Sequence, residues 1–212
     1  MEAHPDLDTF AAAYAEGKAQ VVSASLVADL ETPVSALLKL ADGRPYSFLL
    51  ESVTGGAVRG RYSILGMKPD LIWRCRGEQA EVNRRVRYDR DAFEPCPEPS
   101  LASLRRVIAE SRIELPPDLP LLAAGLFGYM SYDMVRLIER LPDDKPDRLG
   151  LPDAVFIRPT VIALFDHIED KITLVTPVWP GEVPARQAYG QARERLGDAL
   201  AEFNRGISHE PL

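Results

Sequence analysis

The sequence predicts an α+β fold in which antiparallel strands form the sheet and amphipathic helices cover it. Three observations support this prediction. Residues 155–165 and 171–178 are apolar runs on either side of a polar turn, as in a hairpin. Short strand patterns separated by turn residues also fill residues 48–76. Helical periodicity appears at residues 100–111 and 184–204, outside these strands.

The first element is predicted to be a short amphipathic helix near the start of the chain. Asp6 or Asp8 can cap its amino terminus, because a carboxylate accepts hydrogen bonds from the free N–H groups of the first turn. Phe10 and Tyr14 lie four residues apart on one helical face. Gly17 then ends the helix, since glycine readily adopts positive φ.

A strand at residues 21–27 is followed by a second helix. Thr32-Pro33 indicates the start of this helix, because proline is tolerated in the first turn, where its missing N–H would be unpaired anyway. We expect the apolar residues of this helix to form one inward stripe, made of Val34, Leu37, Leu38 and Leu40.

Three strands are predicted next, at residues 48–53, 61–66 and 71–76. The first two are joined through Gly55-Gly56, and Pro69-Asp70 separates the third. In the third, arginines alternate with apolar residues, so Trp73 and Cys75 should face inward while Arg74 and Arg76 face water. Residues 79–88 can pair back on this strand, which gives an antiparallel sheet with one wet face.

The second half of the chain alternates helices, connectors and strands. A proline-containing connector at 91–100 leads to a helix at 100–111, and residues 121–129 resemble a buried strand. Gly125 and Gly128 in that segment indicate a close backbone approach. The further elements expected are a helix at 132–140, a mobile loop at 143–151, the hairpin 155–178, a helix at 184–204 carrying Tyr189, Leu196, Leu200 and Phe203 on one side, and a frayed tail at 206–212.

Composition and charge exclude several function classes. The chain has 212 residues, 46% hydrophobic content and a net charge of −7, which argues against general affinity for nucleic acid or an anionic membrane. Its longest apolar run, residues 121–130, is about half of the ~20 residues that a membrane-spanning helix needs. The acidic start lacks the features of a signal peptide. We therefore expect a cytoplasmic protein.

Chemistry-bearing clusters are few. Cys75 and Cys96 lack a zinc-site spacing, although a disulfide between them stays open. The acidic turn at 166–170 contains His167, but alternate residues point apart, which favours a solvated turn over a metal site. Ser63 and Ser131 have no histidine nearby in sequence, so nothing indicates a catalytic triad.

The most informative feature is a strand that ends on a carboxylate and a hydroxyl, Glu51-Ser52. A carboxylate can hold an ammonium group, and a hydroxyl adds a directional hydrogen bond, so the pair suits one edge of a site for a free amino acid. The alternative is an ordinary meander in which both residues only cap a turn. Residue pattern alone leaves both interpretations open.

Several motifs resemble those of a known family in order and content. They are LLES (49–52), the Gly-Gly turn, RGRYSILG (59–66) and PDLIWR (69–74), preceded by VADLETPVSALLKLADG (27–43) and followed by AAGLFGYMSYDMVRLIERLP (123–142) and PDAVFIRPTVIALFDHIEDKITLVTPV (152–178). Together they resemble the amino-terminal part of anthranilate synthase component I, a chorismate-utilising lyase. Nearly the whole chain is covered by the resemblance.

The resemblance implies antiparallel sheets packed as a sandwich with helices outside, in one regulatory domain spanning residues 1–212. It implies that Leu50, Glu51 and Ser52 help to form the allosteric L-tryptophan site. It adds residues in neighbouring motifs, which are Pro33, Arg61, Tyr62 and Ser63. The complete enzyme would convert chorismate and ammonia, released from glutamine by an amidotransferase subunit, into anthranilate and pyruvate.

The carboxy-terminal chorismate-binding domain of that family, with its magnesium ligands and catalytic residues, has no counterpart in these 212 residues. We therefore expect an inactive fragment with no cofactor of its own and weak or no tryptophan binding. Two alternatives stay open: the corresponding region of aminodeoxychorismate synthase component I, and a stand-alone ligand-binding or docking domain. Reading the coding sequence past Leu212 would distinguish the last alternative from a fragment.

Overall fold

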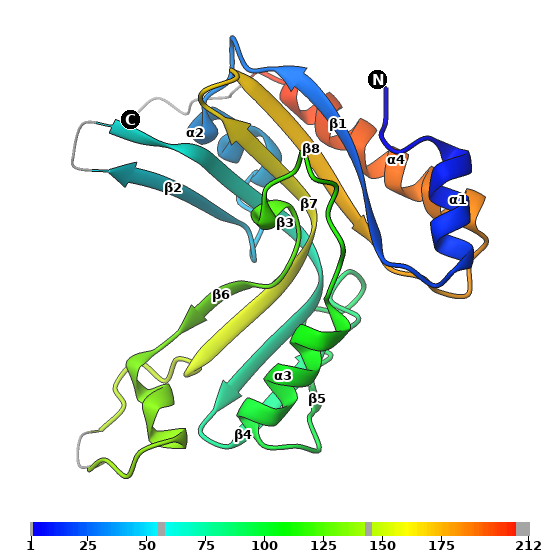
Figure 1. The fold of residues 1–212 in the computed structure, drawn as a ribbon. Coiled ribbons are helices and arrows are strands. Elements are labelled where there is room, and N and C mark those ends of the chain that lie inside the picture. The colour runs from blue at the N-terminus through cyan, green and yellow to red at the C-terminus, as the bar shows by residue number, and fades with distance from the viewer. Residues whose placement is uncertain (1, 55–57, 143–145, 207–212) are drawn as a thin grey trace. The chain divides into compact units, whose positions relative to one another are not determined.

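The computed structural model describes residues 2–54, 58–142 and 146–206, and its contacts divide the chain into two compact units. Unit 1 contains residues 1–68, 113–124 and 160–212, and unit 2 contains residues 69–112 and 125–159. Two long strands, β3 (Val58–Arg76) and β7 (Ala154–Asp166), contribute residues to both units (Figure 1). The predicted loop at 143–151 and the predicted tail at 206–212 fall partly outside the described residues.

The described strands belong to one hydrogen-bonded sheet. Its order is β1 (Gln20–Val27), β8 (Lys171–Val178), β7, β3, β4 (Gln79–Asn83), β5 (Glu94–Pro95), while β2 (Phe48–Thr54) pairs with β3 and β6 (Phe127–Met130) pairs with β7. The pairings are antiparallel. The predicted α+β class is thus confirmed. The predicted sandwich is wrong, because β3 and β7 are long enough to pair with different partners along their lengths, which joins all strands in a single sheet.

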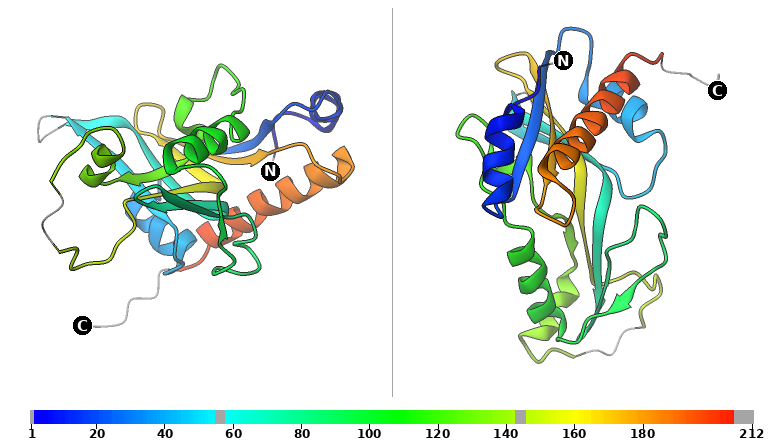
Figure 2. Two further views of the ribbon diagram at one scale, coloured as in Figure 1. Left: turned by 90° about the horizontal axis from the view of Figure 1, so that it is seen from below. Right: turned by 90° about the vertical axis from the view of Figure 1, so that its right-hand side faces the viewer.

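In unit 1, two helices cover β1 and β8. Helix α4 (Ala185–Phe203) lies against both strands, and α1 (Leu7–Ala15) packs beside α4 (Figure 2). Asp6 caps α1 by accepting a hydrogen bond from the backbone N–H of Thr9 at 2.8 Å. Phe10 and Tyr14 are buried, as the sequence predicted. These rings join a core that includes Val22, Leu65, Met67, Ile172, Leu174 and Leu196.

The second helix is short, and it ends in a π-helical turn that the sequence did not predict. Thr32 and Ser35 form a reciprocal capping box at the start of α2 (Pro33–Ala36), which continues as a π-helical turn, η1 (Leu37–Ala41). Leu40, within the π-helical turn, is buried, whereas Leu38 in the same turn and Val34 in α2 are about half exposed. The predicted inward stripe is therefore wrong at Val34 and Leu38.

β3 is one continuous strand of 19 residues, although two strands separated by Pro69-Asp70 were predicted. The irregularity lies at Lys68, whose φ is 53°, immediately before the proline. Pairing with its neighbours therefore carries the strand through a sequence that resembles a turn. The predicted facing is confirmed, because Trp73 and Cys75 are buried, and Cys75 and Cys96 are free thiols.

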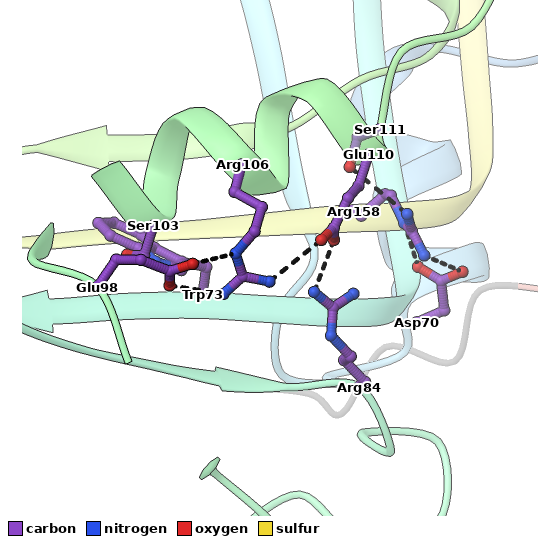
Figure 3. Close-up of polar contacts among 9 residues, drawn as sticks. All are labelled: Asp70, Trp73, Arg84, Glu98, Ser103, Arg106, Glu110, Ser111 and Arg158. Carbon is purple, nitrogen blue, oxygen red and sulfur yellow. Dashed lines mark hydrogen bonds and ion pairs between the residues drawn. The ribbon is translucent and has the colours of Figure 1, made fainter. Parts of the chain in front are cut away.

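In unit 2, helix α3 (Ser100–Glu110) packs on the face of the sheet where Trp73 points inward. The Trp73 indole N–H donates to Ser103 Oγ at 3.0 Å. An ion-pair chain runs along the helix through Glu98, Arg106, Glu110 and Arg84, and Arg158 binds Asp70 through two nitrogens (Figure 3). These contacts fix α3 and the adjacent strands within unit 2.

The segment at 121–142 differs from its prediction. A 3₁₀ turn, η2 (Leu121–Ala123), replaces the start of the expected strand, and the expected helix is the 3₁₀ segment η3 (Tyr132–Leu137). The close backbone approach predicted here is confirmed at Gly128, where an added Cβ would lie 1.8 Å from the Val155 carbonyl oxygen, but it is wrong at Gly125, where an added Cβ would meet nothing within 4 Å. The strand was also predicted to be buried, whereas residues 128–130 of β6 are exposed. Likewise, the strand predicted at 79–88 ends earlier, at Asn83, where β4 ends.

Candidate functional site

The candidate site lies on the β2–β3 hairpin of unit 1. Leu50 pairs with Ile64 across the hairpin, and Glu51 pairs with Ser63. Directly opposite residues of an antiparallel pair project to the same face, so Glu51 and Ser63 share one side of the sheet. Glu51 is exposed and Ser63 is 2% exposed, so the carboxylate is open to solvent while the hydroxyl is buried.

The hairpin contains a register shift at the motif that the sequence singled out. Glu51 pairs with Ser63, but Val53 pairs with Arg59. One residue of β2, Ser52, therefore lies opposite three residues of β3, the segment 60–62. We call this segment the β3 bulge. Bulges bend a strand and change the direction of nearby side chains, and they occur next to ligand sites.

The turn between β7 and β8 contacts the β3 bulge on its other side. The His167 backbone N–H donates to the Arg61 carbonyl oxygen at 2.9 Å. The His167 ring contacts Ser63 through a hydrogen bond of 2.7 Å between Nε2 and Oγ. A buried hydroxyl needs such a partner, because an unpaired buried polar group costs about 1–3 kcal/mol.

Charged side chains add to the contact between the β3 bulge and the turn that joins β7 to β8. The Arg61 guanidinium donates to Asp166 Oδ2 from Nε at 3.0 Å and from a terminal nitrogen at 2.7 Å, and it reaches Glu169 at 3.5 Å. The bond from Arg61 lowers the pKa of the Asp166 carboxyl, although partial burial acts in the opposite direction. The same guanidinium lies 4.9 Å from the centre of the Tyr62 ring. The Arg61 guanidinium is thus bound to the turn. The hairpin also carries the exposed carboxylate of Glu51, which suits an ammonium group.

Six of the seven predicted site residues lie on this one hairpin, and Pro33 does not. Pro33 is buried in the first turn of α2, in a different part of unit 1. Sequence reasoning missed Asp166, His167 and Glu169, which it interpreted as a solvated turn. No local pattern could have revealed their role, because Arg61 and Asp166 are 105 residues apart.

The Ser63–His167 pair resembles half of a nucleophilic triad, but its environment does not suit catalysis. Ser63 is almost completely buried, so a substrate carbonyl has no approach to its hydroxyl. The hydrogen bond therefore fixes the strand to the turn. Among the described residues, no group of three or more His, Cys, Asp or Glu side chains has the geometry of a metal site.

Two pockets elsewhere offer weaker arrangements. A pocket of about 690 Å³ in unit 2 is lined by four prolines and by arginine side chains that already bind carbonyls or carboxylates, such as Arg74 and Arg76. A second, of about 700 Å³ in unit 1, surrounds the end of η1 and includes Arg44, which already binds Glu202. Within the described part of the chain, no helix is both long and apolar enough to span a bilayer.

Comparison with known proteins points to one enzyme. The chain is 54% identical over 199 residues to anthranilate synthase component 1 of Cereibacter sphaeroides, covering 93% of this chain and 40% of that protein. It is 44% identical over 170 residues to the Thermus thermophilus protein of the same name, covering 80% of this chain and 35% of the relative. For the Pseudomonas aeruginosa protein the identity is 35% over 193 residues, covering 88% and 37%. No protein-family model matches.

A solved structure extends the likeness to the fold. The crystal structure of anthranilate synthase component I from Streptococcus pneumoniae matches with a TM-score of 0.53 and 22% identity, covering 85% of this chain and 38% of that one. The chain therefore spans about 40% or less of the length of these proteins.

Proposed function

Because the chain is homologous to the amino-terminal part of anthranilate synthase component 1, we propose that it is the feedback-regulatory region of such an enzyme. In this proposal, residues 1–212 act as one regulatory region in a cytoplasmic enzyme and contain part of the site that binds L-tryptophan. The identity of 54% over 93% of the chain is the observation that carries it. The composition also suits a small-molecule ligand better than nucleic acid or a membrane.

The proposed tryptophan site is the rim of the β2–β3 hairpin. Glu51 would hold the ammonium group of the amino acid, and Leu50, which is 49% exposed, would contact its apolar part. Ser52, the next residue of the motif, would supply a hydroxyl. Arg61, Tyr62 and Ser63 lie on the facing strand, while Pro33 would act from α2. The charge that the hairpin would offer to the amino acid is the Glu51 carboxylate, since the Arg61 guanidinium already binds Asp166 and Glu169.

The reaction that we propose would be carried out by the complete enzyme and not by residues 1–212 alone. A catalytic domain and a glutamine amidotransferase subunit would be the partners, and chorismate and glutamine would give anthranilate, pyruvate and glutamate. Magnesium would bind in the catalytic domain. Tryptophan would inhibit by binding more tightly to the arrangement that cannot turn over chorismate, because a ligand shifts an equilibrium only by its difference in affinity.

The test is Ser52→Phe in the complete product of the gene, supplied with ammonia or with its amidotransferase. A phenyl ring opposite the bulge should block the ligand, so the tryptophan concentration that halves anthranilate formation should rise about tenfold or more, which corresponds to ~1.4 kcal/mol of lost binding. Anthranilate fluorescence gives the rate, and each variant is compared with its own rate without tryptophan.

Ser25→Phe is the matched control, because Ser25 is an exposed strand residue in β1 of the same unit. It should leave inhibition unchanged. Unchanged inhibition in Ser52→Phe would contradict the site assignment. Formation of aminodeoxychorismate in place of anthranilate would contradict the proposed reaction.

A further inference from the structure

We propose that the turn between β7 and β8, residues 166–170, is a positioning element of the tryptophan site, acting through its contacts with the β3 bulge. This inference rests on the proposed function, since it concerns the same site. It assigns a role to His167, Asp166 and Glu169, which lie outside the motif that carries the site residues. His167 is the central residue, because it contacts β3 through both its backbone and its ring.

The β3 bulge is the reason why the site needs support. Three residues of β3 lie opposite the single residue Ser52, so the segment 60–62 is not held by a regular ladder on its β2 side. If the segment 60–62 paired regularly with β2, the register of the hairpin would shift. A shift of one residue would exchange the faces of Glu51 and Ser52, because side chains alternate along a strand.

The turn supplies the missing restraint from the opposite side of β3. His167 binds the Arg61 carbonyl at 2.9 Å and Ser63 Oγ at 2.7 Å, one contact within the bulge and one directly after it. The Arg61 guanidinium binds Asp166 through two nitrogens, so backbone and side chain of the same residue are both held.

Hydrogen bonds within the turn also hold its own backbone. Asp166 Oδ1 accepts hydrogen bonds from the backbone N–H groups of Ile168 at 3.0 Å and Glu169 at 3.3 Å. The other oxygen of this carboxylate remains on Arg61. One aspartate thus closes the turn and joins it to the bulge, and it sets the position of the His167 ring between them.

Ser63 transmits this restraint to the ligand rim. It lies directly opposite Glu51, the residue proposed to hold the ammonium group. Because Ser63 is 2% exposed, it acts on the ligand through strand position and not through direct contact. Loss of the His167 ring should therefore weaken tryptophan binding, although the ring itself need not touch the ligand.

The experiment compares His167→Ala with His167→Gln in the complete gene product. The glutamine amide nitrogen extends about as far from the backbone as Nε2 of histidine, so it can still bind Ser63, whereas alanine cannot. We expect the tryptophan concentration for half-inhibition to rise about tenfold in His167→Ala and to stay near the wild-type value in His167→Gln. Ile168→Ala, at a position that is 72% exposed in the same turn, should leave it unchanged.

Amide hydrogen exchange gives a readout of the mechanism. Peptides that cover residues 58–66 should exchange faster in His167→Ala than in the wild type, and they should be protected again in His167→Gln. Unaltered exchange in His167→Ala, or the same resistance to tryptophan in both variants, would overturn the role of this hydrogen bond.

Ser52→Phe in the same assay separates the two proposals. If Ser52→Phe is resistant to tryptophan while His167→Ala remains as sensitive as the wild type, the tryptophan site stands and the positioning role of the turn is wrong. If Ser52→Phe remains sensitive, the site assignment itself fails, whatever the His167 variants do.

Discussion

Single residues carry the chemistry of the candidate site, and their contacts come from distant parts of the sequence. Glu51 and Ser63 are brought together by a hairpin whose turn lies within a few residues of both, so the sequence could predict that they lie on neighbouring strands. His167 is different, because its contact with Ser63 spans 104 residues. Local pattern therefore predicts that the candidate residues of the hairpin lie together, but not their contact with the turn at 166–170.

Asp166 gives this contact a defined pH dependence. The Arg61 guanidinium lowers the pKa of Asp166 in the folded protein. A lowered folded-state pKa means that the contribution to stability is present above the unfolded pKa of about 3.9 and is lost as the pH falls through the lower folded value. We therefore expect the wild type to exceed Asp166→Asn in free energy of unfolding at pH 7, and this difference to shrink below about pH 4.

Urea unfolding of both proteins between pH 7 and pH 3 measures this difference. Asparagine keeps an oxygen that can accept the turn N–H groups, so the comparison tests the contact of the second oxygen with Arg61. Asp170→Asn, which neutralises an exposed carboxylate in the same turn, is the control. A difference that stays constant over the whole pH range would show that the Arg61–Asp166 charge pair does not stabilise the fold.

At the scale of elements, local signals predicted some segments well and failed where tertiary pairing decides. Helix α1 was predictable, because Asp6, Phe10 and Tyr14 provide a cap and an apolar face within nine residues. β3 was not, because Pro69 indicates a break, whereas hydrogen bonds to its neighbours keep the strand continuous. The 3₁₀ segments near residue 130 likewise lack a pattern that separates them from an α-helix or a strand.

Gly128 is an element-scale feature that the sequence did reveal, and it predicts a strong effect of a small substitution. Gly128→Ala would place a methyl group 1.8 Å from the Val155 carbonyl oxygen, so β6 would have to move away from β7. We expect a loss of about 3 kcal/mol in the free energy of unfolding, near the upper end for overpacking.

The matched control is Gly190→Ala in the middle of α4, where an added Cβ meets nothing within 4 Å. This change should raise stability by about 0.5–1 kcal/mol, because alanine loses less conformational freedom than glycine in a helix. Thermal and urea denaturation of the two variants and the wild type measure both changes in the free energy of unfolding. Equal stabilities for Gly128→Ala and the wild type would show that the strands are farther apart than described.

At the scale of the whole molecule, two cores lie along the same two long strands. Leu65 and Met67 of β3 belong to the unit 1 core, while Leu71 and Trp73 of the same strand belong to the unit 2 core. The sequence predicted the antiparallel α+β class from hairpin signals. It did not predict a single sheet, because nothing in a short window shows that one strand serves two cores.

This continuity predicts that the two units unfold together. The chain contains two tryptophans, with Trp73 in unit 2 and Trp179 in unit 1. In Trp73→Phe the remaining tryptophan is Trp179, so its fluorescence reports on unit 1. In Trp179→Phe the remaining tryptophan is Trp73, so its fluorescence reports on unit 2. We expect the fluorescence midpoint in urea to coincide with the circular dichroism midpoint in each variant, as in a two-state transition. Separate midpoints in either variant would show that the units unfold independently.

The division into units has a further consequence for the gene. Unit 1 is encoded in three separate stretches and unit 2 in two, with the crossings falling inside β3 and β7. A contiguous stretch of coding sequence that holds all of unit 2, residues 69–159, therefore also holds residues 113–124 of unit 1. A recombination event that exchanges unit 2 would therefore also exchange this segment of unit 1, and it would join the two parental sequences within β3 and β7.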